Sequence, residues 1–159
     1  MDFNPQATAC FTGHRKLPAD GAYHALRIAT ENAVRDLIGK GYDTFLVGGA
    51  LGFDTLAQQI LQDLRKEFPY IRIVMAVPCP EQDAQWMPED RRIYRNLLEA
   101  ADARILIARE YTKDCMLKRN RFMVSRSSVC IAYHVHAGGG TDYTVRYAAN
   151  RGVPVIRVP

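Results

Sequence analysis

Residues 130–148 read CIAYHVHAGGGTDYTVRYA and contain a strand pattern, a glycine loop and a helix pattern in direct succession. The opening apolar run is rich in β-branched and aromatic residues, which is typical of a buried strand. After the three glycines, the spacing predicts an amphipathic helix that begins at Thr141. Glycine allows positive φ and close backbone approach, and a helix N-terminus presents unpaired N–H donors. The stretch therefore has two interpretations, a phosphate cradle or a tight turn with Thr141 as N-cap.

The same succession of strand and helix patterns continues along the whole chain. Six short β-rich runs are predicted as strands, at residues 8–12, 44–47, 72–77, 104–108, 128–133 and 155–158. Five segments with helical spacing lie between them, at residues 23–37, 56–68, 93–101, 116–124 and 143–148. This alternation predicts an α/β fold, a doubly wound parallel sheet with helices on both faces.

The composition favours a cytoplasmic protein with an anionic partner. Neither a run of about eighteen apolar residues nor a signal-like start occurs, so we expect no membrane partner. The net charge is +4, but the basic residues are scattered, so a small phosphorylated ligand and a nucleic acid both remain open. The four cysteines lack metal or CxxC spacing, which favours reduced thiols over disulfides or zinc.

Three glycine loops follow predicted strands: TGHRKLPADG, GGALGFDT and AGGGTDYT. In a parallel sheet, ligands bind outside the carboxyl ends of the strands, where the strand order reverses. Three such loops at one edge favour a ligand, with a phosphate cradle formed by Gly138, Gly139, Gly140 and Thr141. None is the G-x-G-x-x-G fingerprint and no Walker A motif occurs, which disfavours an ordinary NAD dehydrogenase and a P-loop ATPase.

The first two loops supply further candidate ligand-binding residues: Thr12, Gly13, His14, Arg15, Gly48, Gly49 and Asp54. The Arg15 fork suits a phosphate. His14 has no visible carboxylate partner, so binding is favoured over acid–base catalysis. Asp54 either accepts ribose hydroxyls or caps the second helix, and its position favours capping.

Other candidates lie outside the glycine loops. Arg119 belongs to the basic stretch MLKRNRFMVSRSS, which is either a solvated face or a face that turns Arg119 or Asn120 toward an anion. Trp86 either stacks on a base or anchors its loop. The pair His134 and His136 lacks a third residue with ligand spacing, so no metal site is expected and a structural or substrate-contacting role is favoured.

Four motifs in order carry a family resemblance: CFTGHR, GGALGFDTLAQ, CPEQDAQW with the following RRIYRNLLEAAD, and GGGTDYTVRYA. Together they resemble the YpsA-like family of the SLOG superfamily over nearly the whole chain. The resemblance implies a single SLOG-type, Rossmann-like domain over residues 1–159 that recognises a nucleotide-derived ligand. It also suggests a connection with bacterial cell division or stress.

Two neighbours within the superfamily suggest other functions. GGALGFD resembles a loop of DprA, a single-stranded-DNA-binding recombination mediator. MLKRNRFM and AGGGTDYT resemble the LOG phosphoribohydrolases, in which an arginine and a glutamate act on nucleoside monophosphates. Arg119 matches that arginine, but Thr144 stands where LOG has its glutamate, which leaves enzymatic activity doubtful because a hydroxyl is a poor substitute for the carboxylate.

The leading hypothesis is recognition of ADP-ribose, an NAD-like molecule or a similar phosphorylated nucleotide in a sensor or regulatory role, with no cofactor required. A hydrolase of N-glycosidic or phosphate bonds is one alternative, with Asp54, His14 and Arg119 as candidate catalytic residues. Single-stranded DNA binding is another. A homodimer is expected only by analogy with related domains.

Overall fold

The computed structural model describes residues 2–159, which build one six-stranded sheet between layers of helices. The strands are β1 (Thr8–Gly13), β2 (Thr44–Val47), β3 (Arg72–Val77), β4 (Ala103–Leu106), β5 (Val129–Tyr133) and β6 (Val155–Arg157). The helices are η1 (Pro5–Ala7, a 3-10 helix), α1 (Asp20–Gly39), α2 (Phe53–Glu67), α3 (Pro88–Ala100), α4 (Cys115–Ser125) and α5 (Gly139–Asn150). The predicted doubly wound α/β class is confirmed.

All strand pairings in the sheet are parallel, and the strand order is β4-β3-β2-β1-β5-β6. The chain moves from β1 outward to β4 and then crosses back to place β5 on the other side of β1. The strand order therefore reverses between β1 and β5, where an open parallel sheet binds its ligands. The loops after these two strands flank the reversal point.

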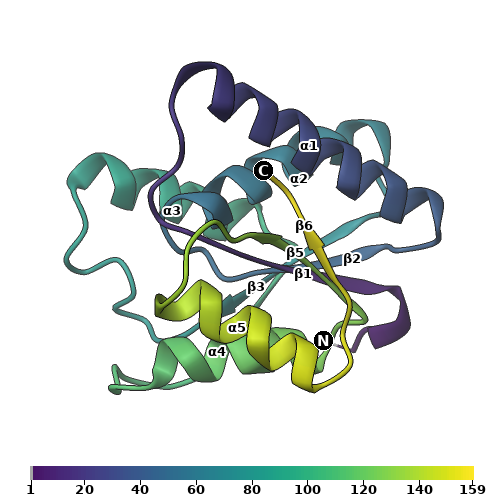
Figure 1. Cartoon of the computed structure of the whole chain (residues 1–159). Helices are drawn as coiled ribbons and strands as arrows, with labels where there is room; N and C mark the ends of the chain where they lie inside the picture. The colour runs from purple at the N-terminus through teal and green to yellow at the C-terminus, as the bar shows by residue number, and fades with distance from the viewer. Residues whose placement is uncertain (1) are drawn as a thin grey trace.

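The helices divide into two layers (Figure 1). Helices α1, α2 and α3 cover one face of the sheet, and α4 and α5 cover the other, as right-handed crossovers require for this strand order. Each face has its own apolar core, the larger one beneath α1–α3. Among residues 2–159, we find no helix with the length and apolar character needed to cross a membrane.

The central strands are apolar runs because they are covered on both faces. Every residue of β2 and β5 is buried, and so is all of β1 except Gly13. Continuous burial explains why these strands lack the alternating pattern of a half-exposed sheet. In α2, by contrast, Leu56, Ile60 and Leu64 recur at helical spacing and face the core.

Element boundaries differ from the sequence-based predictions at two places that matter. Strand β4 occupies Ala103–Leu106 rather than residues 104–108. Helix α5 begins at Gly139, so the prediction that it begins at Thr141 is wrong. Its N-cap is Gly138 with φ of 84°, a value that glycine adopts without the cost a β-carbon would add, and no side chain caps the helix. Thr141 therefore lies inside the first turn.

The four cysteines are free and buried, in agreement with the prediction of reduced thiols. Cys10 and Cys130 are direct neighbours on β1 and β5. The hydrogen bond to Cys10 and burial raise the pKa of the Cys130 thiol well above its usual value. The Cys130 thiol therefore stays protonated, and both buried side chains pack as small apolar groups.

Candidate ligand-binding site

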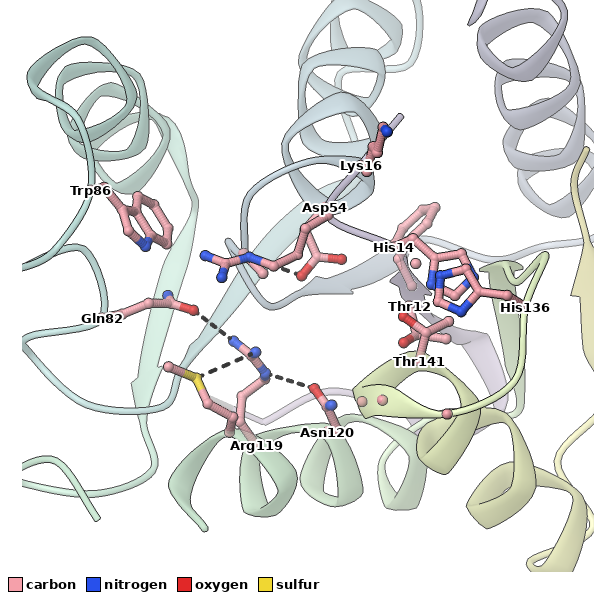
Figure 2. Close-up of a pocket in the computed structure, with 18 residues that line it drawn as sticks. Thr12, His14, Lys16, Asp54, Gln82, Trp86, Arg119, Asn120, His136 and Thr141 are labelled. Carbon is pink, nitrogen blue, oxygen red and sulfur yellow. Dashed lines mark hydrogen bonds between the residues drawn. The ribbon is translucent and has the colours of Figure 1, made fainter. Parts of the chain in front are cut away.

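A cavity of about 480 Å³ opens at the carboxyl ends of the central strands, beside the point where the strand order reverses. Its size lies in the range of small-molecule sites. Figure 2 shows His14, Thr12, His136 and Thr141 on one side, Gln82 and Trp86 on the opposite side, and Asp54 facing α4 between them. The lining residues are Phe11, Thr12, Gly13, His14, Arg15, Lys16, Ala50, Asp54, Gln82, Trp86, Met116, Arg119, Asn120, His136, Gly138, Gly139, Gly140 and Thr141.

The glycine loop forms one end of the cavity with its backbone. Gly138 and Gly139 have φ of 84° and 81°, and no atom lies within 4 Å of the position that a β-carbon would take. The first N–H groups of α5 have no partner within the helix and therefore remain available to a ligand. The Thr141 hydroxyl adds a donor, because this buried residue lines the same wall.

A buried carboxylate anchors this loop from behind. The backbone N–H of Gly138 is the first cause of the lowered pKa of the Asp142 carboxyl. Nε2 of His134 lies 2.9 Å from Asp142 Oδ1, and Nδ1 lies 2.6 Å from Arg157 Nη1. Because arginine only donates, His134 accepts at Nδ1 and donates from Nε2. His134 therefore has a structural role, one of the two alternatives predicted from the sequence.

His14 and His136 form a stacked pair at the same end. Their ring centroids lie 3.7 Å apart with an interplanar angle of 15°. Nε2 of His14 accepts the N–H of Val135 at 2.9 Å, so the ring is neutral and carries its hydrogen on Nδ1. Burial, followed by the nearby His136, lowers the pKa of His14. A neutral donor tied to the loop after β5 supports the predicted preference for binding over acid–base work.

Metal ligation has no support in this part of the molecule. Over residues 2–159, no group of three or more histidine, cysteine, aspartate or glutamate side chains is arranged to hold a metal ion. The imidazoles of His14 and His134 are both engaged in hydrogen bonds with protein groups.

Asp54 lies in the first turn of α2 and is only 5% exposed. The helix is capped by Gly52, not by Asp54, because φ of 85° at Gly52 turns the chain into the helix. Asp54 Oδ2 instead accepts the N–H of Ala50 at 3.2 Å, so it secures the preceding loop and also lines the cavity. Burial raises the pKa of Asp54 to about 6, against the opposing effect of Arg119.

Arg119 projects from α4 toward the cavity and is only 4% exposed (Figure 2). Its Nη1 donates to the Gly48 carbonyl at 2.5 Å and to Gln82 Oε1 at 3.2 Å, and its Nε donates to Asn120 Oδ1 at 2.8 Å. Burial lowers the pKa of the guanidinium, and Asp54 opposes that change. The basic stretch was interpreted either as a solvated face or as a face turned toward an anion. The structure supports the second interpretation in that Arg119 and Asn120 both line the cavity.

Gln82 is a site residue that sequence reasoning missed. It is buried, and its Nε2 donates to the Gly48 carbonyl at 3.2 Å and to the Tyr94 hydroxyl at 3.0 Å. Its loop, CPEQDAQW, has neither glycine nor periodicity to mark this position, so no local signal identifies it. Gln82 joins α3, the loop after β2 and Arg119 into one hydrogen-bonded wall.

Gly48 and Gly49 were predicted to line the ligand side, and this placement needs correction. Neither lines the cavity. A β-carbon on Gly48 would approach the Arg119 guanidinium to 2.7 Å, and one on Gly49 would approach Met75 and Tyr94 to 2.8 Å. Both glycines therefore lie behind the cavity wall, where the tight packing requires the absence of a side chain.

Trp86 and two exposed basic residues complete the lining. The Trp86 ring packs edge-on against Tyr94, with centroids 5.2 Å apart, and it also lines the cavity. Arg15 was predicted as a site residue, whereas its neighbour Lys16 was not. Both are exposed and both line the opening, so the rim carries positive charge.

Thr144, at the position where the LOG pattern has its glutamate, takes no part in the cavity lining. It is 1% exposed, and its hydroxyl donates to the Gly140 carbonyl at 2.7 Å within α5. The hydroxyl is therefore used inside the helix.

Curated relatives share a large part of the sequence. A UPF0398 protein of Halalkalibacterium halodurans is 29% identical over 129 residues, which cover 79% of this chain and 68% of the relative. YoqJ, an SPbeta prophage-derived protein of Bacillus subtilis, is 30% identical over 65% of this chain and 68% of its own length. The UPF0398 protein YpsA of Bacillus subtilis is 25% identical over 83% of this chain and 75% of its own length.

Solved structures of DNA processing protein A share the fold. The protein from Helicobacter pylori, described for its single-stranded DNA binding mode, matches with a TM-score of 0.69 at 21% identity, over 98% of this chain and 66% of that one. The protein from Streptococcus pneumoniae matches with a TM-score of 0.68 at 15% identity, over 98% of this chain and 50% of that one. The present chain thus spans about two thirds or less of their length.

The family model YpsA, described as the YspA SLOG family, matches residues 10–152, which include all four motifs that carry the resemblance. Together with the shared fold and the curated relatives, this match confirms the predicted family. The chain belongs to the YspA SLOG family.

Proposed function

We propose that this protein binds a phosphorylated, nucleotide-derived ligand such as ADP-ribose or an NAD-like molecule, and that occupancy of the cavity serves a sensing or regulatory role. The observation that carries the proposal is the composition of a single cavity of about 480 Å³. One end offers the unpaired N–H groups of a helix N-terminus, the rim offers basic side chains, and the far wall offers an indole. Groups suited to bind a phosphate, to neutralise its charge and to stack on a base thus line one cavity of the size that small molecules occupy.

In this proposal the phosphates bind at the N-terminus of α5. Gly139, Gly140 and Thr141 supply backbone donors and a hydroxyl, and the helix dipole favours negative charge there. Arg15 and Lys16 at the rim add positive charge. The base extends toward Trp86, whose ring is fixed by Tyr94.

Recognition is favoured over N-glycosidic cleavage of the LOG type by the environment of Thr144. Cleavage with an oxocarbenium-like transition state needs a carboxylate close to the reacting carbon. The hydroxyl that replaces the LOG glutamate is bonded to the Gly140 carbonyl and does not line the cavity. A signal-binding role requires only the cradle and the cavity.

Single-stranded DNA binding is the second candidate function. It is favoured by the fold shared with the Helicobacter pylori protein described for its single-stranded DNA binding mode. The exposed Arg15 and Lys16 at the rim could contact a strand backbone. This function predicts affinity that falls steeply with salt, because each phosphate contact releases a counterion.

Isothermal titration calorimetry separates the two functions. The panel comprises AMP, ADP, ADP-ribose, NAD and an oligothymidylate, each titrated at about 50 and about 200 mM salt. The proposal predicts saturable one-to-one binding of at least one nucleotide with modest salt dependence. Binding of the oligothymidylate alone, with a steep salt dependence, would replace the proposal with the second candidate.

A charge placed in the cradle tests where the ligand binds. Gly139→Asp introduces a carboxylate beside the proposed phosphate position and should reduce nucleotide affinity by more than about tenfold, through like-charge repulsion. Gly152→Asp is the matched control, since Gly152 also has positive φ (72°) and open surroundings but follows the opposite end of α5. Equal nucleotide affinity in both variants would show that the phosphate does not bind beside Gly139.

A further inference from the structure

Two buried charges of opposite sign share the cavity without forming an ion pair. Asp54 and Arg119 are 5% and 4% exposed. In the described part of the chain, Asp54 accepts the Ala50 N–H, and Arg119 donates to neutral acceptors on Gly48, Gln82 and Asn120. Burial of a charge without a direct partner is costly, so this arrangement is unusual unless a ligand completes it.

Each of these side chains has one atom with unused hydrogen-bonding capacity. Asp54 Oδ2 is held by Ala50, whereas Oδ1 has no donor among residues 2–159. Arg119 Nη2 has only the sulfur of Met116, at 3.9 Å, as a partner there. A free carboxylate oxygen and a free guanidinium edge therefore face a common volume (Figure 2).

The chemistry of these two atoms limits which ligand group can lie between them. Asp54 needs a donor and repels a phosphate, whereas Arg119 needs an acceptor and repels an ammonium group. Adjacent hydroxyl groups satisfy both, because each hydroxyl can donate and accept. This part of the cavity also lies between the glycine loop and Trp86, which is where the sugar of a nucleotide belongs if its phosphate and base occupy the two ends.

We propose that Asp54 and Arg119 clamp the 2′,3′-diol of a ribose and make the site selective for ribonucleotides over 2′-deoxyribonucleotides. The proposal rests on the proposed function, since it specifies the sugar of the same ligand. The 2′-hydroxyl donates to Asp54 Oδ1 and the neighbouring 3′-hydroxyl accepts from Arg119 Nη2. Loss of the 2′-hydroxyl leaves a buried charged group without its partner, which is how a polar site rejects an analogue.

Paired titrations of ADP with 2′-deoxy-ADP, and of AMP with 2′-deoxy-AMP, test this clamp. The titrations are made at about pH 8, where Asp54 is ionised, because its pKa is about 6. The wild-type protein should bind the ribose form at least about tenfold more tightly, as expected for loss of one charge-assisted hydrogen bond. Asp54→Ala should reduce the preference to less than about threefold, and Asp54→Asn should give an intermediate value because the amide oxygen still accepts.

A matched control separates the clamp from a general loss of charge. Asp90→Asn removes a carboxylate from the first turn of α3, outside the cavity, and should leave the preference unchanged. Thermal unfolding of each variant shows whether it is folded at the temperature of the titration. The Asn variant keeps the shape of the side chain, which keeps the test usable if Asp54→Ala is poorly folded.

Three results would overturn the proposal in distinguishable ways. Equal wild-type affinity for ribose and deoxyribose forms removes the clamp but leaves the nucleotide site intact. A preference that persists in Asp54→Ala removes Asp54 from sugar recognition. Failure of the folded wild-type protein to bind any of these nucleotides, or ADP-ribose and NAD, overturns both the clamp and the proposed function.

Discussion

Two glycine loops at the same edge of the sheet contain glycine for different structural reasons. At the loop after β5, positions for β-carbons on Gly138 and Gly139 are open, with no atom within 4 Å. At the loop after β2, a β-carbon on Gly52 would lie 2.2 Å from the Arg15 carbonyl oxygen, and one on Gly48 would overlap Arg119. The first loop leaves its backbone free for a ligand, whereas the second brings protein segments into close contact.

This difference teaches that a glycine-rich stretch indicates a backbone that another group can come close to. It does not indicate whether that group is a ligand or another part of the protein. Around Gly52 the approaching group is another part of the chain, and the consequence of a substitution is lost stability. Around Gly139 the space is empty, so the expected consequence is mainly lost binding. Substitutions in the two loops therefore separate packing from recognition.

The largest expected effect is on Gly52→Ala. The new β-carbon would overlap the Arg15 backbone, and φ of 85° is unfavourable for alanine. We expect a loss of about 3 kcal/mol or more in the free energy of unfolding, because backbone cannot move aside as a flexible side chain can. Urea unfolding measures the loss.

Gly21→Ala is the control for this substitution. Gly21 lies in α1 with no atom within 4 Å of its β-carbon position, so alanine should leave stability unchanged or increase it by up to about 1 kcal/mol. If Gly52→Ala and Gly21→Ala unfold at the same urea concentration, the close packing of the second loop against Arg15 does not hold.

The next effect concerns the pH dependence of stability at the first carboxylate after each loop. Asp54 in α2 and Asp142 in α5 should change the free energy of unfolding with opposite signs. Burial raises the pKa of Asp54 from 3.8 to about 6, so the folded state binds the extra proton between these values. Relative to Asp54→Asn, the wild-type protein should lose on the order of 2–3 kcal/mol of stability as the pH rises through this window, and no more above it.

Asp142, in the first turn of α5 after the glycine loop, should behave in the reverse way. The Gly138 N–H and the bond to His134 lower its pKa, so the ionised form stabilises the fold above the ordinary carboxyl pKa. This stabilisation should be lost as the pH falls, and Asp142→Asn should lack it. Urea unfolding as a function of pH measures both variants, and slopes of the same sign would contradict the assignment of opposite environments.

A smaller stability effect is expected from alanine in the open loop. Gly139→Ala and Gly152→Ala both place a β-carbon in open space at a residue with positive φ, 81° and 72°. Each variant should therefore lose about 1 kcal/mol in the free energy of unfolding. Only Gly139→Ala should also weaken nucleotide binding, by about tenfold, because its β-carbon would occupy the ligand side of the cavity. Equal binding by the two variants would assign the open loop no role in recognition.

The smallest effect is expected at the exposed rim. Lys16→Ala should leave the melting temperature unchanged and weaken nucleotide binding only about two- to fivefold at low salt, since an exposed charge is well screened. Titration at about 0.5 M salt should remove most of the difference. A difference that persists at high salt would mean that Lys16 makes a direct, desolvated contact.

Much of the fold could be predicted from the sequence because the parallel strands are continuous apolar runs. Strands β2 and β3 coincide with the predicted residues 44–47 and 72–77, and five helices lie between strands as predicted. Three predicted loops also meet at one edge of the sheet. Element boundaries were predicted wrongly where the backbone conformation of a single residue sets them. The positive φ of Gly138 starts α5 two residues before Thr141.

Within the candidate site, most residues that a motif marks do line the cavity, with Gly48 and Gly49 as exceptions. Residues that only packing places there were not predicted. Thr12, Arg15, Asp54 and Arg119 line the cavity as predicted. Gln82 was missed because its role depends on bonds to segments distant in the sequence. Asp142 was missed as an anchor of the glycine loop because its contacts with Gly138 and His134, although close in the sequence, depend on how the loop turns into α5.

The sequence by itself determined the strand–helix alternation, the family and the set of loops at the carboxyl edge. These properties follow from periodicity and local residue type, which act over a few residues. Only the tertiary structure decided which glycines face open space, and that Asp54 and Arg119 are buried in one cavity without pairing. Burial and contact depend on segments far apart in the chain, since Arg119 bonds to Gly48 across 71 positions.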